Sequence, residues 1–107
     1  MALPHAAPGQ VVDILGSKAA SAQSFALFKT DEIEVMRLVL PAGKFVPSHQ
    51  IAGEVTVQCL EGSFEFTADD EMRVMHAGQL LHLSGGTTYS LVALEDASAL
   101  ITMVLRK

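Results

Sequence analysis

The stretch GKFVPSHQIAGEVTVQCLEG, residues 43–62, decides the fold of this chain. Its second half alternates apolar with polar side chains, the apolar ones being Val55, Val57 and Cys59. An alternation of period two predicts a β-strand with one buried face, and we expect that face to line the inside of a barrel. Gly62 predicts a turn, after which residues 63–67 are expected to return as a hairpin partner of this strand.

The chain from residue 25 onward repeats this pattern of short strand-like runs separated by turns. Turn signals recur about every 8–12 residues, the spacing typical of an all-β sandwich or barrel. No segment after residue 30 shows a sustained helical period. The sequence therefore predicts a barrel domain over residues 25–107, preceded by an N-terminal arm and lead-in segment over residues 1–24. The expected turns lie at residues 41–44, 60–63, 68–71, 75–79 and 84–87.

Composition limits the partners that this chain is expected to have. The 107 residues are enough for one domain, and half of them are hydrophobic. The mean hydropathy is positive, which is high for a small protein and favours a subunit interface, so a homodimer is expected. The net charge is −5, and the seven Lys and Arg residues form no run. Nucleic acid is therefore not expected as a partner, because phosphate contacts need clustered positive charge.

Targeting signals and cysteine content predict the compartment. No apolar stretch of about 20 residues is present, so no membrane span is expected. The first residues, MALPHAAPGQ, lack the basic start and apolar block of a signal peptide. The single Cys59 cannot form an internal disulfide, which fits a reducing compartment. We expect a cytoplasmic protein.

Two glycine-framed motifs carry a family resemblance. The first runs from Gly43 over five residues to His49-Gln50-Ile51, then Glu54 and Gly62. The second runs from Gly78 over five residues to Ser84-Gly85-Gly86, then two residues and Tyr89. Over about residues 33–105 this frame resembles the cupin superfamily, specifically the small, single-domain, RmlC-like conserved-barrel cupins. The resemblance implies an all-β jelly-roll barrel, the cupin double-stranded β-helix, made of two antiparallel sheets and often dimeric.

In metal-bearing cupins, two histidines and a glutamate of the first motif and a histidine of the second bind one ion, usually Fe, Mn, Ni or Zn. His49 stands at the first of these positions, whereas Ile51 occupies the second and has no lone pair to offer. The glutamate position holds Val55. Glu54 is one residue away, and that offset points a strand side chain to the opposite face unless a β-bulge intervenes. The last position holds Tyr89, and tyrosine is a rarer ligand than histidine.

These departures leave three interpretations of the barrel. In the first, most ligands are lost, no cofactor is expected, and the barrel binds a small organic ligand or serves as a non-catalytic module. The second is a metal-dependent enzyme of the dioxygenase or isomerase type, with an atypical site at His49, Glu54 and Tyr89. The third is a metal-free acid–base enzyme with His49 as base and Tyr89 as acid. The predicted pocket consists of His49, Ile51, Val55, Val57, Cys59 and Tyr89.

The same residues also suit a filled core, in which the Tyr89 hydroxyl and His49 hydrogen-bond to each other. Cys59 is expected to be a buried, unreactive thiol. His82 shares a strand face with Leu80, and the sequence leaves open whether it lies in a pocket or is a packed structural residue. His76 beside its turn is expected to be solvated.

Overall fold

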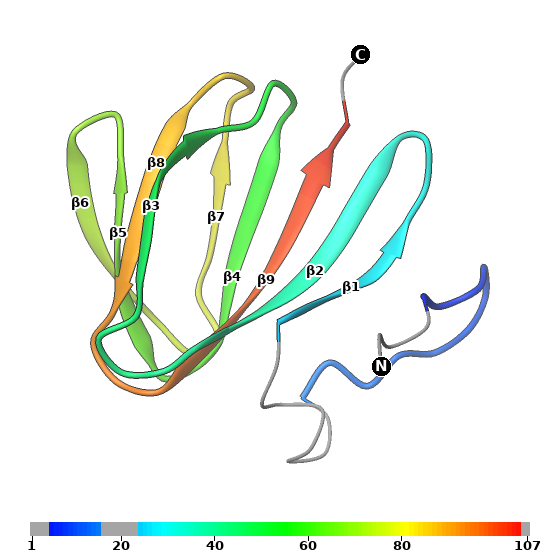
Figure 1. Ribbon diagram of the computed structural model, residues 1–107, viewed down its shortest axis with the longest axis horizontal. Coiled ribbons are helices and arrows are strands. Elements are labelled where there is room, and N and C mark those ends of the chain that lie inside the picture. The colour runs from blue at the N-terminus through cyan, green and yellow to red at the C-terminus, as the bar shows by residue number, and fades with distance from the viewer. Residues whose placement is uncertain (1–4, 16–23, 106–107) are drawn as a thin grey trace.

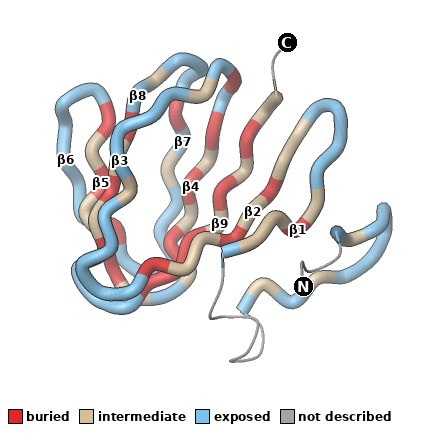
Figure 2. Tube along the Cα trace, viewed as in Figure 1, coloured by how far each residue is buried: buried red, intermediate tan, exposed pale blue. Residues whose placement is uncertain are grey.

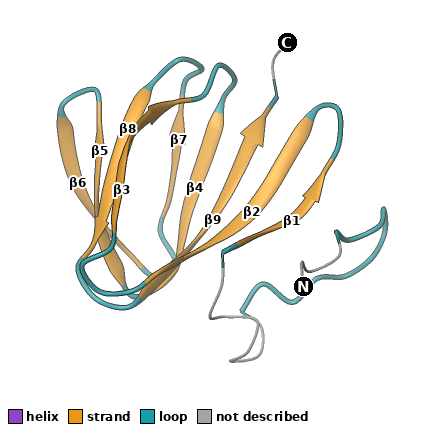
Figure 3. Ribbon diagram, in the orientation of Figure 1, coloured by secondary structure: helices purple, strands orange, loops and turns teal. Residues whose placement is uncertain are grey.

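The computed structural model of the protein describes residues 5–15 and 24–105. Two antiparallel sheets face each other (Figures 1 and 3). The larger sheet has five strands in the order β1-β2-β9-β4-β7, and the smaller sheet has four in the order β3-β8-β5-β6. The strands are β1 (Phe25–Lys29), β2 (Ile33–Leu40), β3 (Phe45–Gln50), β4 (Val55–Glu61), β5 (Ser63–Ala68), β6 (Glu71–His76), β7 (Leu80–Leu83), β8 (Thr88–Ala93) and β9 (Ala97–Val104).

The chain crosses between the two sheets at most of its connections. Only β1–β2 and β5–β6 are joined as hairpins within a sheet, and every other consecutive pair of strands lies in different sheets. This winding is that of a jelly-roll barrel, so the prediction of an all-β jelly roll is confirmed. The connections gather at two ends of the barrel. One end carries the loops 51–54, 69–70 and 84–87, and the other the loops 41–44, 77–79 and 94–96.

The core lies between the two sheets (Figure 2). On β4, Val57 and Cys59 are fully buried, as the alternation predicts, and they pair with Ile101 and Ala99 of β9. The smaller sheet contributes Phe64. Apolar side chains from both sheets thus meet in one continuous core, and their removal from water stabilises the barrel.

The prediction that residues 63–67 pair with β4 as a hairpin is wrong. β4 pairs with β7 and β9 in the larger sheet, whereas β5 pairs with β6 and β8 in the smaller one. Gly62, with φ of 72°, is the whole connection between the two strands. It turns the chain from one sheet into the other, because β4 and β5 both have an apolar face and each buries it from its own side of the core.

The described part of the N-terminal arm, residues 5–15, forms neither helix nor strand. It runs beside β1, where the Ala6 backbone N–H donates to the Leu27 carbonyl over 2.8 Å. Ser24 directly precedes the first residue of β1, Phe25. Residues 5–15 and 24–105 contain no helix, and so none that could cross a membrane.

Candidate functional site at the barrel end

His49 and Tyr89 form a hydrogen-bonded pair near one end of the barrel. β3 and β8 are antiparallel neighbours, and their register places the two residues directly opposite each other. His49 Nε2 lies 2.9 Å from Tyr89 Oη, and the two rings are 4.4 Å apart between centroids. His49 is exposed on the edge strand, whereas only 4% of Tyr89 is exposed. The pair therefore spans the boundary between the solvent and the core.

The environment of Tyr89 keeps its hydroxyl protonated. Its ring stacks on Phe66, with the centroids 5.3 Å apart and the planes inclined by 18°. Burial raises the pKa of the Tyr89 phenol above its usual value, because the phenolate would lose its hydration. The phenol is thus a hydrogen-bonding group at neutral pH.

The other predicted pocket residues lie on β4 and in the loop that follows β3. Val55, Val57 and Cys59 project from β4 into the interior, where they belong to the same core cluster as Tyr89. Ile51 follows β3 and is half-buried against that cluster. The structure therefore brings five of the predicted residues into or against one core, and His49 reaches it through its hydrogen bond.

Cys59 is a buried thiol, as expected from the sequence. It is fully buried, and its Sγ donates to the carbonyls of Glu61 and Gly62 over 3.4 and 3.5 Å. Burial is the main cause that raises the pKa of the Cys59 thiol; the backbone hydrogen bond at Glu61 acts in the opposite direction, and the negative charge of Glu95 adds a smaller increase.

The Glu54 side chain is paired with His82, whereas His49 and Tyr89 are paired with each other. Glu54 Oε1 is 2.8 Å from Nε2 of His82, and both side chains are more than half exposed. The adjacent residue, Val55, is buried in the core, and the register of β4 against β7 runs without interruption from Val55 to Gln58. No bulge in that register turns Glu54 inward. The sequence left open whether His82 lies in a pocket or packs as a structural residue. In the structure its side chain is exposed and is paired with the Glu54 carboxylate.

The donors at the family's metal position do not fit a four-ligand site. His49 and Tyr89 are bonded to each other, Ile51 offers no donor, and Glu54 is paired with His82. A transition-metal site usually needs at least three protein ligands that converge on one point. Across residues 5–15 and 24–105, no group of three or more His, Cys, Asp and Glu side chains is arranged to hold a metal ion.

Hydrogen bonds and a close backbone contact connect the loops around this end, and this contact explains Gly85 of the second motif. The Gly86 N–H donates to the Ile51 carbonyl over 2.9 Å, and the Gln50 side chain donates to the Gly86 carbonyl. A Cβ on Gly85 would lie 2.4 Å from the Ala52 carbonyl oxygen, so only glycine allows this approach. In the sequence, the pair Gly85-Gly86 was the feature that could have indicated this close contact between the loops.

Comparison with known proteins places this geometry in a fold family. No family model matches the chain, and no curated protein matches it. Solved structures do match. A cupin superfamily protein from Desulfitobacterium hafniense has a TM-score of 0.75 at 17% identity, with 78% of this chain and 76% of that chain covered. A conserved protein of unknown function from Streptococcus pyogenes has a TM-score of 0.79 at 20% identity, covering 100% and 96%.

An RmlC-like cupin from Desulfovibrio desulfuricans has a TM-score of 0.70 at 22% identity, and the match covers 97% of each chain. These identities are low, so the likeness concerns the fold and carries no activity with it. The strand order and the glycine frame agree with the same architecture. The protein is a small, single-barrel member of the cupin fold.

Proposed function

We propose that the protein binds a small organic molecule, without a metal, at the barrel end that carries His49 and Tyr89. The observation that carries this proposal is the 2.9 Å hydrogen bond between an exposed imidazole and a buried phenol. Polar groups at the edge of an apolar interior are the usual means of orienting a small ligand. A ligand's polar group would exchange hydrogen bonds with this pair, while its apolar part would pack against Ile51.

The chain contains its own reporter for this proposal. Tyr89 is the only tyrosine and there is no tryptophan, so tyrosine fluorescence arises at the proposed site alone. We expect a screen of small organic fragments to yield compounds that change this emission. Replacing His49 with Gln should weaken their binding about tenfold, the effect of losing one good hydrogen bond. His76→Gln makes the same change at an exposed position on β6 and serves as the control.

Two results would contradict the proposal. One is a screen in which no fragment alters the Tyr89 emission. The other is a set of fragments that bind wild type and His49→Gln equally well, since the pair would then take no part in recognition.

The alternative is a metal-dependent dioxygenase or isomerase at His49, Glu54 and Tyr89. It requires Glu54 to leave His82 and to cross to the inner face of the sheet. The pairing of β4 with β7 opposes that change, because it runs without interruption from Val55 and keeps this adjacent residue on the inner face. We therefore favour the metal-free function.

We further propose a homodimer in the cytoplasm. Large apolar side chains are exposed on both edge strands at one side of the barrel: Leu80 on β7, with 64% exposed, and Met72 and Val74 on β6. Such surface favours association, and the free thiol of Cys59 suits a reducing compartment. Light scattering at micromolar concentration tests the dimer, and a mass of one chain would refute it.

A further inference from the structure

A second polar site lies at the other end of the barrel, outside the core. It is a pocket of about 360 Å³ where β2 and β4 end and β9 begins. This volume falls within the usual range of small-molecule sites, about 300–1,000 Å³. Its polar lining residues are Arg37, Glu61, Asp96 and Ser98, and Val39 and Pro41 are among its apolar ones.

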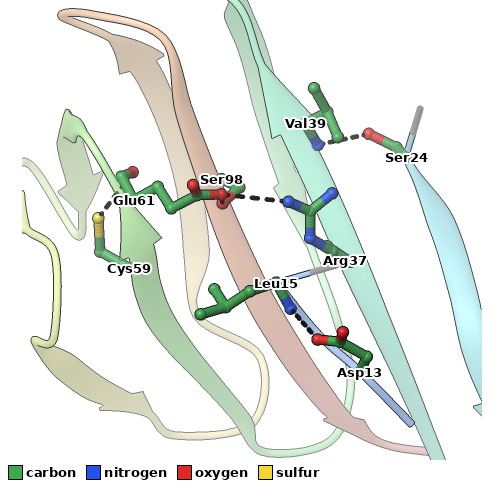
Figure 4. A network of polar contacts seen from close by, with 8 residues as sticks. All are labelled: Asp13, Leu15, Ser24, Arg37, Val39, Cys59, Glu61 and Ser98. Atoms are coloured by element: carbon green, nitrogen blue, oxygen red, sulfur yellow. Dashed lines mark hydrogen bonds and ion pairs between the residues drawn. The ribbon is translucent and has the colours of Figure 1, made fainter. Parts of the chain in front are cut away.

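Arg37 brings unmet hydrogen-bond donors to this pocket (Figure 4). Only 2% of the residue is exposed, and Nη2 donates to Oε1 of Glu61 over 3.2 Å. Nε and Nη1 are shielded from water, and within residues 5–15 and 24–105 neither has a hydrogen-bond partner. A guanidinium keeps its charge at every physiological pH, and leaving its donors unmet in a buried position is unfavourable. A ligand oxygen that reached this group would supply the missing partner.

The same pocket also carries negative charge. Ser98 Oγ donates to Glu61 Oε1 over 2.9 Å, and Asp96 Oδ1 accepts the Ala42 backbone N–H over 2.9 Å. Glu61 is more than half exposed, which leaves its side chain room to move when a ligand arrives. A simple anion would face two carboxylates here, and a simple cation would face the guanidinium. A molecule with both charges meets an opposite charge at each end.

We propose that this pocket binds a small zwitterionic amino acid. Its carboxylate takes the donors of Arg37, its ammonium group faces Asp96, and its side chain lies against Val39 and Pro41. The site is outside the barrel and at the opposite end from His49. It therefore goes beyond the function proposed above and does not depend on it.

Saturation-transfer NMR with the proteinogenic L-amino acids tests the proposal first. Each amino acid that binds is then compared by calorimetry with two matched compounds, the amine that lacks its carboxylate and the carboxylic acid that lacks its ammonium group. We expect the amino acid to bind at least about tenfold more tightly than either, because each compound loses one charge-assisted contact.

Variants then identify the residues. Asp96→Asn keeps an oxygen for the Ala42 N–H and removes the charge. It should weaken binding of the amino acid about tenfold while leaving that of the matched carboxylic acid unchanged. Asp31→Asn makes the same substitution at an exposed position before β2 and should change neither. Arg37→Gln should abolish binding of both compounds; if that variant fails to fold, Asp96→Asn decides the matter.

Three outcomes would overturn the proposal. The first is that no amino acid binds the wild-type protein. The second is that Asp96→Asn and Asp31→Asn bind the amino acid equally well. The third is a wild-type dimer that Arg37→Gln separates into single chains, which would show that a second copy supplies the missing partner.

Discussion

At its position in the core, Tyr89 differs from a phenylalanine by one hydroxyl group. The ring stacks on Phe66, and the oxygen reaches His49 at the edge of the smaller sheet. The hydroxyl is therefore not needed to fill space, and its contribution can be measured apart from that of the ring.

Tyr89→Phe is expected to lower the free energy of unfolding by about 1 kcal/mol, because one hydrogen bond is lost and the packing is kept. Urea denaturation of the wild type, Tyr89→Phe, His49→Gln and the double variant measures the coupling between the two side chains. We expect the double variant to be little less stable than the worse single variant. Fully additive losses would show that the two side chains do not interact in solution.

The pH dependence of stability follows from the raised pKa of Tyr89. The folded-state pKa lies above that of the unfolded chain, so the folded protein holds the phenolic proton more tightly. This contribution to stability is complete below the unfolded pKa, near 10.0, and is lost as the pH rises through the folded value. Since there is one tyrosine, the ultraviolet absorbance of phenolate follows it directly. A folded-state midpoint at or below that of the unfolded chain would be inconsistent with a buried phenol.

At the scale of elements, the turn between β4 and β5 determines how the two sheets are connected. Gly62 has φ of 72°, and a Cβ there would lie 2.2 Å from the carbonyl oxygen of Asp96 and 2.9 Å from Cα of Ala97. Both atoms belong to the backbone that leads into β9, so they cannot move without disturbing the larger sheet. This position therefore combines a left-handed conformation with a steric limit.

Gly62→Ala is expected to destabilise the protein by more than Gly78→Ala. Gly78 also has a positive φ, of 89°, but no atom lies within 4 Å of a Cβ built there. Gly78→Ala should cost about 1–2 kcal/mol for the left-handed conformation alone, and Gly62→Ala should add the clash to that penalty. Thermal or urea unfolding of the two variants gives the comparison. Equal losses would mean that the β4–β5 turn relaxes freely.

The strands could be predicted from the sequence more fully than their partners could. Alternation in residues 55–60 correctly indicates which side chains are buried, because burial of one face depends on local pattern. It does not indicate the neighbouring strand, so the hairpin expected between residues 55–60 and 63–67 is absent. Pairing depends on contacts between residues far apart in the chain, such as Val57 with Ile101. The turn glycine suits a hairpin and a crossing between sheets equally well.

At the candidate site, too, the sequence indicated the direction of a side chain but not its partner. The one-residue offset of Glu54 from the family position implies an outward side chain, and the structure places it outward. The sequence did not reveal its partner, His82, which lies 28 residues further along. Nor did it single out Arg37, which stands in the apolar run of β2. A basic residue inside such a run was the available signal, but its burial depends on what packs over the sheet.

At the scale of the whole molecule, the barrel has two chemically different ends. At one end, the phenol of Tyr89 belongs to the apolar core and is hydrogen-bonded to the imidazole of His49. At the opposite end, on the outside of the larger sheet, the buried guanidinium of Arg37 lies in a pocket with the exposed carboxylates of Glu61 and Asp96. The cupin architecture supplies the frame for both, and the side chains at each end determine what it can bind.

We propose that this barrel keeps the cupin frame but holds no metal at the position where the frame can bind one. The decisive experiment is metal analysis of protein purified without an affinity tag or chelator, with His49→Ala measured beside the wild type. We predict that neither protein carries stoichiometric Fe, Mn, Ni or Zn. A stoichiometric metal in the wild type that disappears in His49→Ala would show that the frame still binds metal, and Glu54 and Tyr89 would be the next ligands to test.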